Sequence, residues 1–306
     1  MTSCIGRSLK LIRQNSSPVE RARWPAYAWV GLLLIAVCWP INWTVKGATA
    51  YLFFPLWLGY VLVVDALVTI RTGSSIWTRS RKDFVLLFVA SSPVWWLFEI
   101  INQRTANWEY LGSAHFATVE YYLLCTISFS TVMPAIFETT ELVGTSKWIG
   151  RFAKGPRIQK SGTLEAGIFL SGIAMLMLTL AWPKYFYPFV WTSLVLILEP
   201  VNRWLGREHF LEYLERGDWR PIISLSIGAL ICGFFWEMWN YYSWPKWVYH
   251  TPGTQFLHIF EMPLVGYGGH VPFALELFEL RNILWRKAPR GTLSTPQRAS
   301  TALDPM

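Results

Sequence analysis

The chain has few charged residues and few cysteines. Asp, Glu, Lys and Arg make up 15% of its 306 residues, whereas soluble domains average about 25%. The four cysteines lie far apart with no Cys-x-x-Cys pair, so we expect neither a structural zinc site nor a disulfide framework. A Gly-rich phosphate loop, an Asp-rich prenyltransferase motif, HExxH and GxSxG are also missing. The common nucleotide, metalloprotease and serine hydrolase sites are therefore excluded, and we expect no metal and no cofactor.

Long apolar runs dominate what is present. Hydrophobic residues make up 53% of the chain and the mean hydropathy is +0.31. Runs of about 20 apolar residues are long enough to cross a bilayer as helices. The sequence therefore predicts an all-α, polytopic membrane protein with eight transmembrane helices, near residues 24–44, 51–70, 83–103, 119–140, 163–182, 186–203, 221–241 and 257–280.

The basic residues alternate with these runs. If the N-terminus is cytoplasmic, all Lys and Arg residues fall on the cytoplasmic side except Lys46, Arg104, Lys184 and Lys246. The positive-inside rule then places both termini in the cytoplasm, and we expect the inner membrane of a bacterial cell. The net charge of +8 follows from this orientation, so nucleic acid is not an expected partner.

The chain also carries similar motifs twice. Residues 95–110 read WWLFEIINQRTANWEY and residues 235–249 read FWEMWNYYSWPKWVY, each with Glu-x-x-Asn followed by Trp-x-Tyr. Further matches pair Pro55, Trp57 and Asp65 with Pro188, Trp191 and Glu199, and Pro134, Glu138 and Glu141 with Pro272, Glu276 and Glu279. We therefore expect two tandem, parallel four-helix repeats. The expected organisation is a basic arm (1–23), repeat one (24–142), a linker (143–162), repeat two (163–287) and a disordered tail (288–306).

Acidic residues are expected in two layers. In the outer layer, Asn102 and Asn240 lie one turn after Glu99 and Glu237 on the same helix face. Glu120, Glu261 and His258 lie near the starts of the following spans, and a roof of aromatic side chains covers them, formed by Trp108, Tyr110, Trp247 and Tyr249. The inner layer holds Asp65, Glu199 and the Glu138/Glu141 and Glu276/Glu279 pairs, which we expect to pair with basic residues and fix helix packing.

The outer acids have two interpretations. A carboxyl group in an aromatic pocket can act as a general acid, with Glu99, Glu237, Glu120 and Glu261 as catalytic candidates. The substrate-binding candidates are Asn102, Asn240, Trp96, Trp236, Trp108, Trp247, Tyr110, Tyr249, His258 and His270. Equally, Glu and Asn side chains can join helices by hydrogen bonds.

Two segments depart from regular spans. Residues 263–272, PLVGYGGHVP, predict a break inside the last span, and His270 within it is either a packed or a catalytic histidine. Residues 204–218 predict an amphipathic helix at the cytoplasmic surface.

The pattern of an intramembrane acid, a Trp-x-aromatic loop and a second acid at the next span resembles the integral-membrane lycopene cyclases of bacteria and fungi and the related carotenoid hydratases. The matching positions cover about 30 residues in each repeat and are Glu99, Trp108, Tyr110 and Glu120, then Glu237, Trp247, Tyr249, Glu261 and Pro263. The resemblance implies paired small helical units and cofactor-free protonation of an isoprenoid double bond by membrane carboxyl groups.

Three functions remain open at this stage. The first is a lyase or isomerase that acts on a lipid-soluble, isoprenoid or carotenoid-like substrate, and it predicts a closed apolar cavity. The second is a secondary transporter or proton-coupled carrier, which predicts a polar cavity between the repeats. The third is a non-catalytic membrane scaffold, in which every intramembrane acid is paired and no sizeable pocket exists. The expected partner is membrane lipid or a lipid-soluble molecule.

Overall fold

The computed structural model describes residues 23–159 and 161–285. The expected arm, up to residue 22, and the tail (288–306) lie outside these ranges. The described part is all-α, and its long helices are α2 (Ala26–Thr44), α3 (Thr49–Thr72), α5 (Arg81–Thr105), α6 (Thr118–Phe129), α7 (Val132–Gly144), α8 (Gly162–Ala181), α10 (Val190–Trp204), α12 (Arg220–Tyr241) and α13 (His270–Leu284).

Short elements connect these helices. The α-helical ones are α4 (Ile76–Arg79), α9 (Pro183–Phe186) and α11 (Phe210–Glu215), and the 3₁₀ turns are η1 (Ser113–His115), η2 (Lys147–Ala153), η3 (Tyr187–Phe189) and η4 (Leu264–Gly269). The strands form two small antiparallel pairs, β1 (Trp108–Leu111) with β2 (Lys246–Tyr249) and β3 (His258–Ile259) with β4 (Met262–Pro263).

Six helices in the described ranges are long and apolar enough to cross a membrane. They are α2, α3, α5, the α6–α7 stretch Thr118–Gly144, α8 and α12. These match six of the eight expected spans, and they identify a multi-pass membrane protein. The two remaining expected spans correspond to η3–α10 and η4–α13, where the α-helical part is 15 residues long in each case.

The structure corrects two expected segments. Residues 257–269 do not continue the last span, because they form the β3–β4 hairpin and η4 before α13 begins at His270. The predicted helix over 204–218 is reduced to α11, Phe210–Glu215. Glycines flank α11: Gly206 precedes it and Gly217 follows it, both with positive φ, which glycine adopts at little cost.

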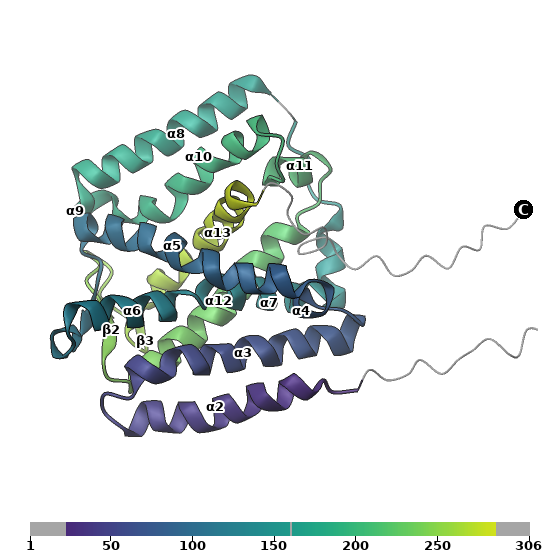
Figure 1. Cartoon of the computed structure of the whole chain (residues 1–306). Coiled ribbons are helices and arrows are strands. Elements are labelled where there is room, and N and C mark those ends of the chain that lie inside the picture. The colour runs from purple at the N-terminus through teal and green to yellow at the C-terminus, as the bar shows by residue number, and fades with distance from the viewer. Residues whose placement is uncertain (1–22, 160, 286–306) are drawn as a thin grey trace, which may run out of the picture.

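The long helices pack in two outer pairs with a central group between them. Figure 1 shows α2 beside α3 along one side and α8 beside α10 along the other, with α5, α7, α12 and α13 between. Glycine allows close approach in both outer pairs. A Cβ on Gly31 of α2 would lie 2.8 Å from the Gly59 carbonyl oxygen of α3, and a Cβ on Gly172 of α8 would lie 2.8 Å from the Ser193 carbonyl oxygen of α10. Small residues at helix contacts are typical of membrane bundles, where packing replaces hydrophobic burial as the driving force.

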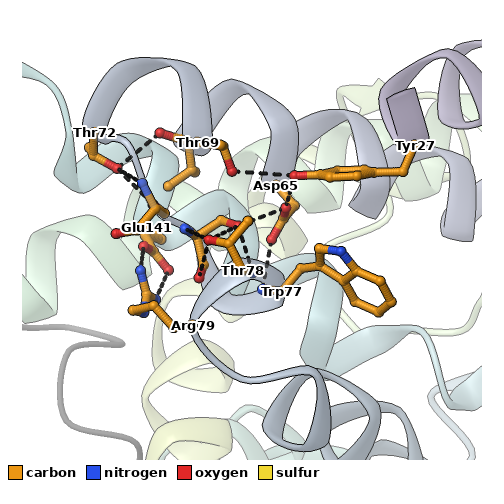
Figure 2. Close-up of polar contacts among 11 residues, drawn as sticks. Tyr27, Asp65, Thr69, Thr72, Trp77, Thr78, Arg79 and Glu141 are labelled. Atoms are coloured by element: carbon orange, nitrogen blue, oxygen red, sulfur yellow. Dashed lines mark hydrogen bonds and ion pairs between the residues drawn. The ribbon is translucent and has the colours of Figure 1, made fainter. Parts of the chain in front are cut away.

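The two ends of the bundle carry different elements. The paired strands and α9 lie at one end, which we call the ladder end, and α4 and α11 lie at the opposite end (Figure 1). Buried carboxylates organise the α4/α11 end. Asp65 of α3 is fully buried and accepts hydrogen bonds from Tyr27 Oη at 2.6 Å, Ser75 Oγ at 2.8 Å and the Trp77 backbone N–H at 3.0 Å (Figure 2). This one side chain therefore joins α2, α3 and the start of α4.

Glu199 of α10 makes the same kind of contact with α11. It accepts hydrogen bonds from the backbone N–H groups of Phe210 and Leu211, both at 2.8 Å, and lies 3.0 Å from His209 Nδ1. The spacing also repeats, since the partners lie 10 and 12 residues after the acid in both cases. Each acid satisfies the free N–H groups at the start of a short helix.

The other inner acids are only partly paired with basic residues. Glu141 matches the expectation, because Arg79 binds both its oxygens at 2.6 and 2.7 Å (Figure 2). Glu279 instead accepts a hydrogen bond from Asn202. Glu138 and Glu276 are fully buried, and their carboxyl oxygens have no hydrogen-bond partner within the described ranges.

We predict that Asp65→Ala strongly destabilises the bundle. Three donors lose their acceptor in a buried place where no water replaces it, so the free energy of unfolding should fall by roughly 2–4 kcal/mol. Thermal unfolding in detergent measures the change. The control is Glu212→Ala, which removes an exposed pair with Arg216 and should have little effect. Equal melting temperatures for the two variants would contradict this role of Asp65.

Candidate functional site

The two Trp-x-Tyr motifs face each other at the ladder end. In the β1–β2 pair, Trp108 lies opposite Tyr249 and Tyr110 lies opposite Trp247. The register is therefore symmetric, with each tryptophan across from the tyrosine of the other motif. Two segments that are far apart in the chain meet here through backbone pairing.

Each motif also binds the glutamate of its own helix. Glu99 of α5 accepts three hydrogen bonds on Oε1, from Tyr110 Oη at 2.6 Å and from the Nε1 atoms of Trp95 and Trp108, each at 3.0 Å. Glu237 of α12 accepts two on Oε1, from Tyr249 Oη at 2.6 Å and Trp247 Nε1 at 3.2 Å. The aromatic roof that the sequence predicts is thus a set of donors that fixes both carboxyl groups.

Asn102 and Asn240 hold the strands rather than a ligand. Asn102 donates to the Trp108 carbonyl at 2.8 Å and accepts from the Trp108 N–H at 3.3 Å. Asn240 does the same to Trp247, at 2.8 and 2.9 Å. Each asparagine lies one turn after its glutamate, so the Glu-x-x-Asn spacing positions both the backbone and the aromatic donors of the strand.

The two phenols act as hydrogen-bond donors. Burial, reinforced by the adjacent Glu99 carboxylate, raises the pKa of Tyr110 well above its usual value. Burial and the adjacent Glu237 raise the pKa of Tyr249 in the same way. Both hydroxyl groups therefore keep their protons throughout the physiological range and continue to donate to the carboxyl oxygens.

A cavity of about 480 Å³ lies against the ladder. Its wall is built from α3, α5, α6, α10, α12, α13 and η4, and is mainly apolar. Aromatic side chains make up much of this wall, namely Phe53, Trp95, Trp108, Phe129, Trp191, Trp236, Trp247 and Phe273. A pocket of this size and lining suits an apolar ligand.

Glu237 and Glu99 differ in their relation to the cavity. Glu237 lines it, is only 1% exposed, and its Oε2 has no hydrogen-bond partner in the described part of the chain. Glu99 does not line the cavity and is only partly buried. The similar motifs therefore present one carboxyl group to the cavity and keep the other outside it.

His270, the first residue of α13, also lines the cavity. Its ring stacks on Trp236 with a centroid distance of 6.3 Å and an interplanar angle of 19°. Nδ1 is buried and has no hydrogen-bond partner among the residues described. Two residues of the cavity lining, one with a carboxyl group and one with an imidazole, thus each carry a buried polar atom without a hydrogen-bond partner in the described part of the chain.

The remaining expected site residues lie elsewhere. Glu120 is exposed and accepts a hydrogen bond from Tyr51 Oη at 2.8 Å. Glu261 pairs with Lys246, His258 is exposed, and Trp96 Nε1 donates to Thr126 Oγ1 at 3.1 Å. The outer acids therefore do not converge on one point, and among the four catalytic candidates only Glu237 lines the cavity.

Sequence reasoning left Trp191 and Phe273 out of the site. Trp191 stacks on Trp108 at 5.9 Å and on Phe98 at 5.5 Å, and Phe273 meets Trp191 edge-on at 5.6 Å. The match of Trp191 with Trp57 marked that position as repeated, but Trp57 is fully buried in the core. The sequence match alone therefore carried no sign that Trp191 borders a cavity.

We predict that Asn240→Ala loosens the ladder. Trp247 loses both backbone contacts to the asparagine side chain, so amide hydrogens of residues 246–249 should exchange roughly tenfold faster. Hydrogen-exchange mass spectrometry measures this. Gln103→Ala is the control, because Gln103 is an exposed neighbour of Asn102. Unchanged protection of β2 in Asn240→Ala would contradict the anchoring role.

No family model, no curated protein and no solved structure matches the chain. The resemblance to membrane lycopene cyclases therefore rests on the residues quoted for it. The observations that bear on function are the hydrogen bonds of the two glutamates, the cavity, and the presence of Glu237 and His270 in its lining.

Proposed function

We propose that the protein is an integral membrane enzyme that acts on a lipid-soluble, isoprenoid-like substrate by acid catalysis. The observation that carries the proposal is Glu237, whose carboxyl group lies in the wall of an apolar cavity with one oxygen bound and the other free. Glu237 is the proton donor, and no cofactor takes part.

The proposed topology has eight transmembrane helices in two tandem parallel repeats, with both termini in the cytoplasm of a bacterial cell. Three sets of contacts that occur twice support it. They are the Glu–Trp–Tyr hydrogen bonds, the asparagine contacts to the strands, and the acids that cap α4 and α11. Helices α10 and α13 serve as the two shorter spans, with η3 and η4 completing their length. The distribution of Lys and Arg puts the α4/α11 end in the cytoplasm.

Hydrogen bonding determines where a proton on Glu237 can reside. Oε1 receives the Tyr249 hydroxyl and the Trp247 indole N–H. Oε2 receives no hydrogen bond within the described ranges. A proton on this carboxyl group is therefore carried by Oε2, which is buried on a residue that lines the cavity. General acid catalysis then requires Oε2 to turn toward the bound substrate.

The first chemical step follows from this geometry. The proton leaves Glu237 Oε2 for one carbon of a double bond, and the π electron pair of that bond forms the new C–H bond. The other carbon becomes a carbocation, and Glu237 becomes a carboxylate. Tyr249 and Trp247 stabilise the carboxylate by their hydrogen bonds.

The aromatic wall suits the cationic intermediate. The faces of Trp and Phe rings carry partial negative charge and attract a nearby cation, most strongly in Trp. Trp108, Trp191, Trp236 and Trp247 all line the cavity. A wall of this kind stabilises a carbocation through its ring faces.

The cavity supports the enzyme over the other two functions. A carrier of polar solutes needs a polar passage between the repeats, whereas this cavity is mainly apolar. A scaffold needs every buried acid to be paired, yet Glu237 Oε2 and the oxygens of Glu138 and Glu276 lack partners in the described part.

We predict that Glu237→Gln abolishes turnover and leaves the fold intact. The amide oxygen still accepts from Tyr249 and Trp247, but the side chain has no acidic proton, so turnover should fall at least about 100-fold. The matched variant is Glu99→Gln, which should stay within a few-fold of the wild type because Glu99 does not line the cavity.

The assay compares membrane lipids in the presence of each protein. Proteoliposomes are prepared with a lipid extract of the membrane in which the protein naturally occurs. Mass spectrometry then identifies the lipid species that the wild type consumes. Consumption of that species by folded Glu237→Gln at the wild-type rate would refute the proposal.

A further inference from the structure

The connection between α7 and α8, residues 145–161, concentrates positive charge. Between Glu141 of α7 and Glu165 of α8 the sequence has five Lys and Arg residues and no Asp or Glu. Four of these basic residues lie in the described ranges and are exposed, namely Lys147, Arg151, Lys154 and Arg157. The α6–α7 stretch and α8 are both long and apolar enough to cross a membrane. The connection therefore lies at the membrane surface, beside the lipid headgroups.

These four side chains differ from other basic residues at the α4/α11 end, where several arginines are already paired with acids. The pairs are Arg79–Glu141, Arg203–Glu165, Arg216–Glu212, Arg220–Asp218 and Arg281–Glu208. By contrast, the four basic side chains of the α7–α8 connection make no ion pair and no side-chain hydrogen bond within residues 23–159 and 161–285. Their positive charge is therefore not neutralised by this part of the protein.

The backbone of the connection is held against α11 and the start of α12. Ile149 is only 1% exposed and belongs to the core. The backbone hydrogen bonds run from Trp219 N–H to the Phe152 carbonyl at 2.9 Å, from Gly155 N–H to the Gly217 carbonyl at 2.7 Å and from Ile158 N–H to the Leu214 carbonyl at 3.1 Å. The charged side chains thus extend from backbone that is already ordered, which lowers the entropy cost of binding a ligand.

An exposed tryptophan accompanies these charges. Trp148 is 40% exposed and packs edge-on against Phe152, with ring centroids 6.0 Å apart. Arg71 of α3 places a further guanidinium group beside the connection, because its Nη1 donates to Thr145 Oγ1 at 3.1 Å. Tryptophan favours the interfacial region of a bilayer, and Lys and Arg near that region attract anionic headgroups. The two residue types together are expected of a surface that contacts lipid headgroups.

We propose that the α7–α8 connection binds the headgroups of anionic phospholipids in the leaflet at the α4/α11 end. Its Lys and Arg side chains donate charge-assisted hydrogen bonds to the phosphate oxygens. A zwitterionic headgroup has the same phosphate but also carries a cation that the basic residues repel, so the surface selects lipids with net negative charge. This binding surface is separate from the cavity and does not depend on the proposed function.

The experiment measures lipid binding to the full chain in detergent by native mass spectrometry. Phosphatidylglycerol and phosphatidylcholine with the same acyl chains are the anionic and zwitterionic probes. The test variants are Lys147→Gln/Arg151→Gln and Lys154→Gln/Arg157→Gln. The matched control is Lys46→Gln/Lys184→Gln, which also removes two exposed positive charges, but at the ladder end. A second control, Arg151→Lys/Arg157→Lys, changes two side chains of the connection and keeps their charge.

The wild type should bind phosphatidylglycerol more tightly than phosphatidylcholine. Each removed charge should weaken phosphatidylglycerol binding about fivefold, so each test variant should bind it roughly 10- to 30-fold more weakly. Phosphatidylcholine binding should not change, both controls should bind phosphatidylglycerol as the wild type does, and equal melting temperatures should show that every variant is folded.

Three results would overturn the proposal. The first is equal affinity of the wild type for the two lipids, and the second is unchanged phosphatidylglycerol binding in both test variants. The third is displacement of phosphatidylglycerol by inorganic phosphate, which would show that the surface binds free phosphate instead of a lipid. The measurement involves no turnover, so its outcome is independent of the role of Glu237.

Discussion

A carboxyl group inside a membrane can receive hydrogen bonds only from the protein, because lipid offers no donors. This requirement governs both ends of the bundle. At one end, Asp65 and Glu199 bind the N–H groups that start α4 and α11. At the ladder end, Glu99 and Glu237 bind phenol and indole donors from β1 and β2. The short helices and the two-stranded ladder are therefore positioned by the same acids that the bilayer would otherwise exclude.

The two halves meet this requirement to different extents, and the difference is what suggests chemistry. Glu99 receives three donors, all on Oε1, and does not line the cavity. Glu237 receives two, because Gly233 occupies the position that matches Trp95, and its second oxygen is buried without a hydrogen-bond partner in the described part of the chain. Glu99 is therefore assigned a structural role, and Glu237 is assigned the proposed chemistry.

The sequence predicted the class of protein, the positions of six spans and an aromatic roof near Glu99 and Glu237, because these follow from apolar run length and from spacing along the chain. It did not predict that the roof donates hydrogen bonds to the two carboxyl groups. It did not predict which acid lines the cavity. That distinction depends on Gly233 and His270, which lie far apart in the chain and meet only through packing of α12 against α13. The sequence also grouped Glu120 and Glu261 with the other outer acids. The position of a residue along its span can be estimated from sequence, but the neighbouring helix toward which its side chain points cannot. The sequence predicted part of the change in the last span. The glycines and prolines of residues 263–272 indicated a break, but they did not indicate that the α-helix begins only at His270.

An apolar carbodiimide, dicyclohexylcarbodiimide, tests the central claim without knowledge of the substrate. It takes the proton of a carboxylic acid on one nitrogen, the carboxylate oxygen then attacks its central carbon, and the adduct rearranges to a stable acylurea that peptide mass spectrometry locates. Glu237 lines the apolar cavity and Glu99 does not. The account predicts an adduct on the Glu237 peptide and none on the Glu99 peptide. Equal modification of both glutamates, or modification of Glu99 alone, would contradict it.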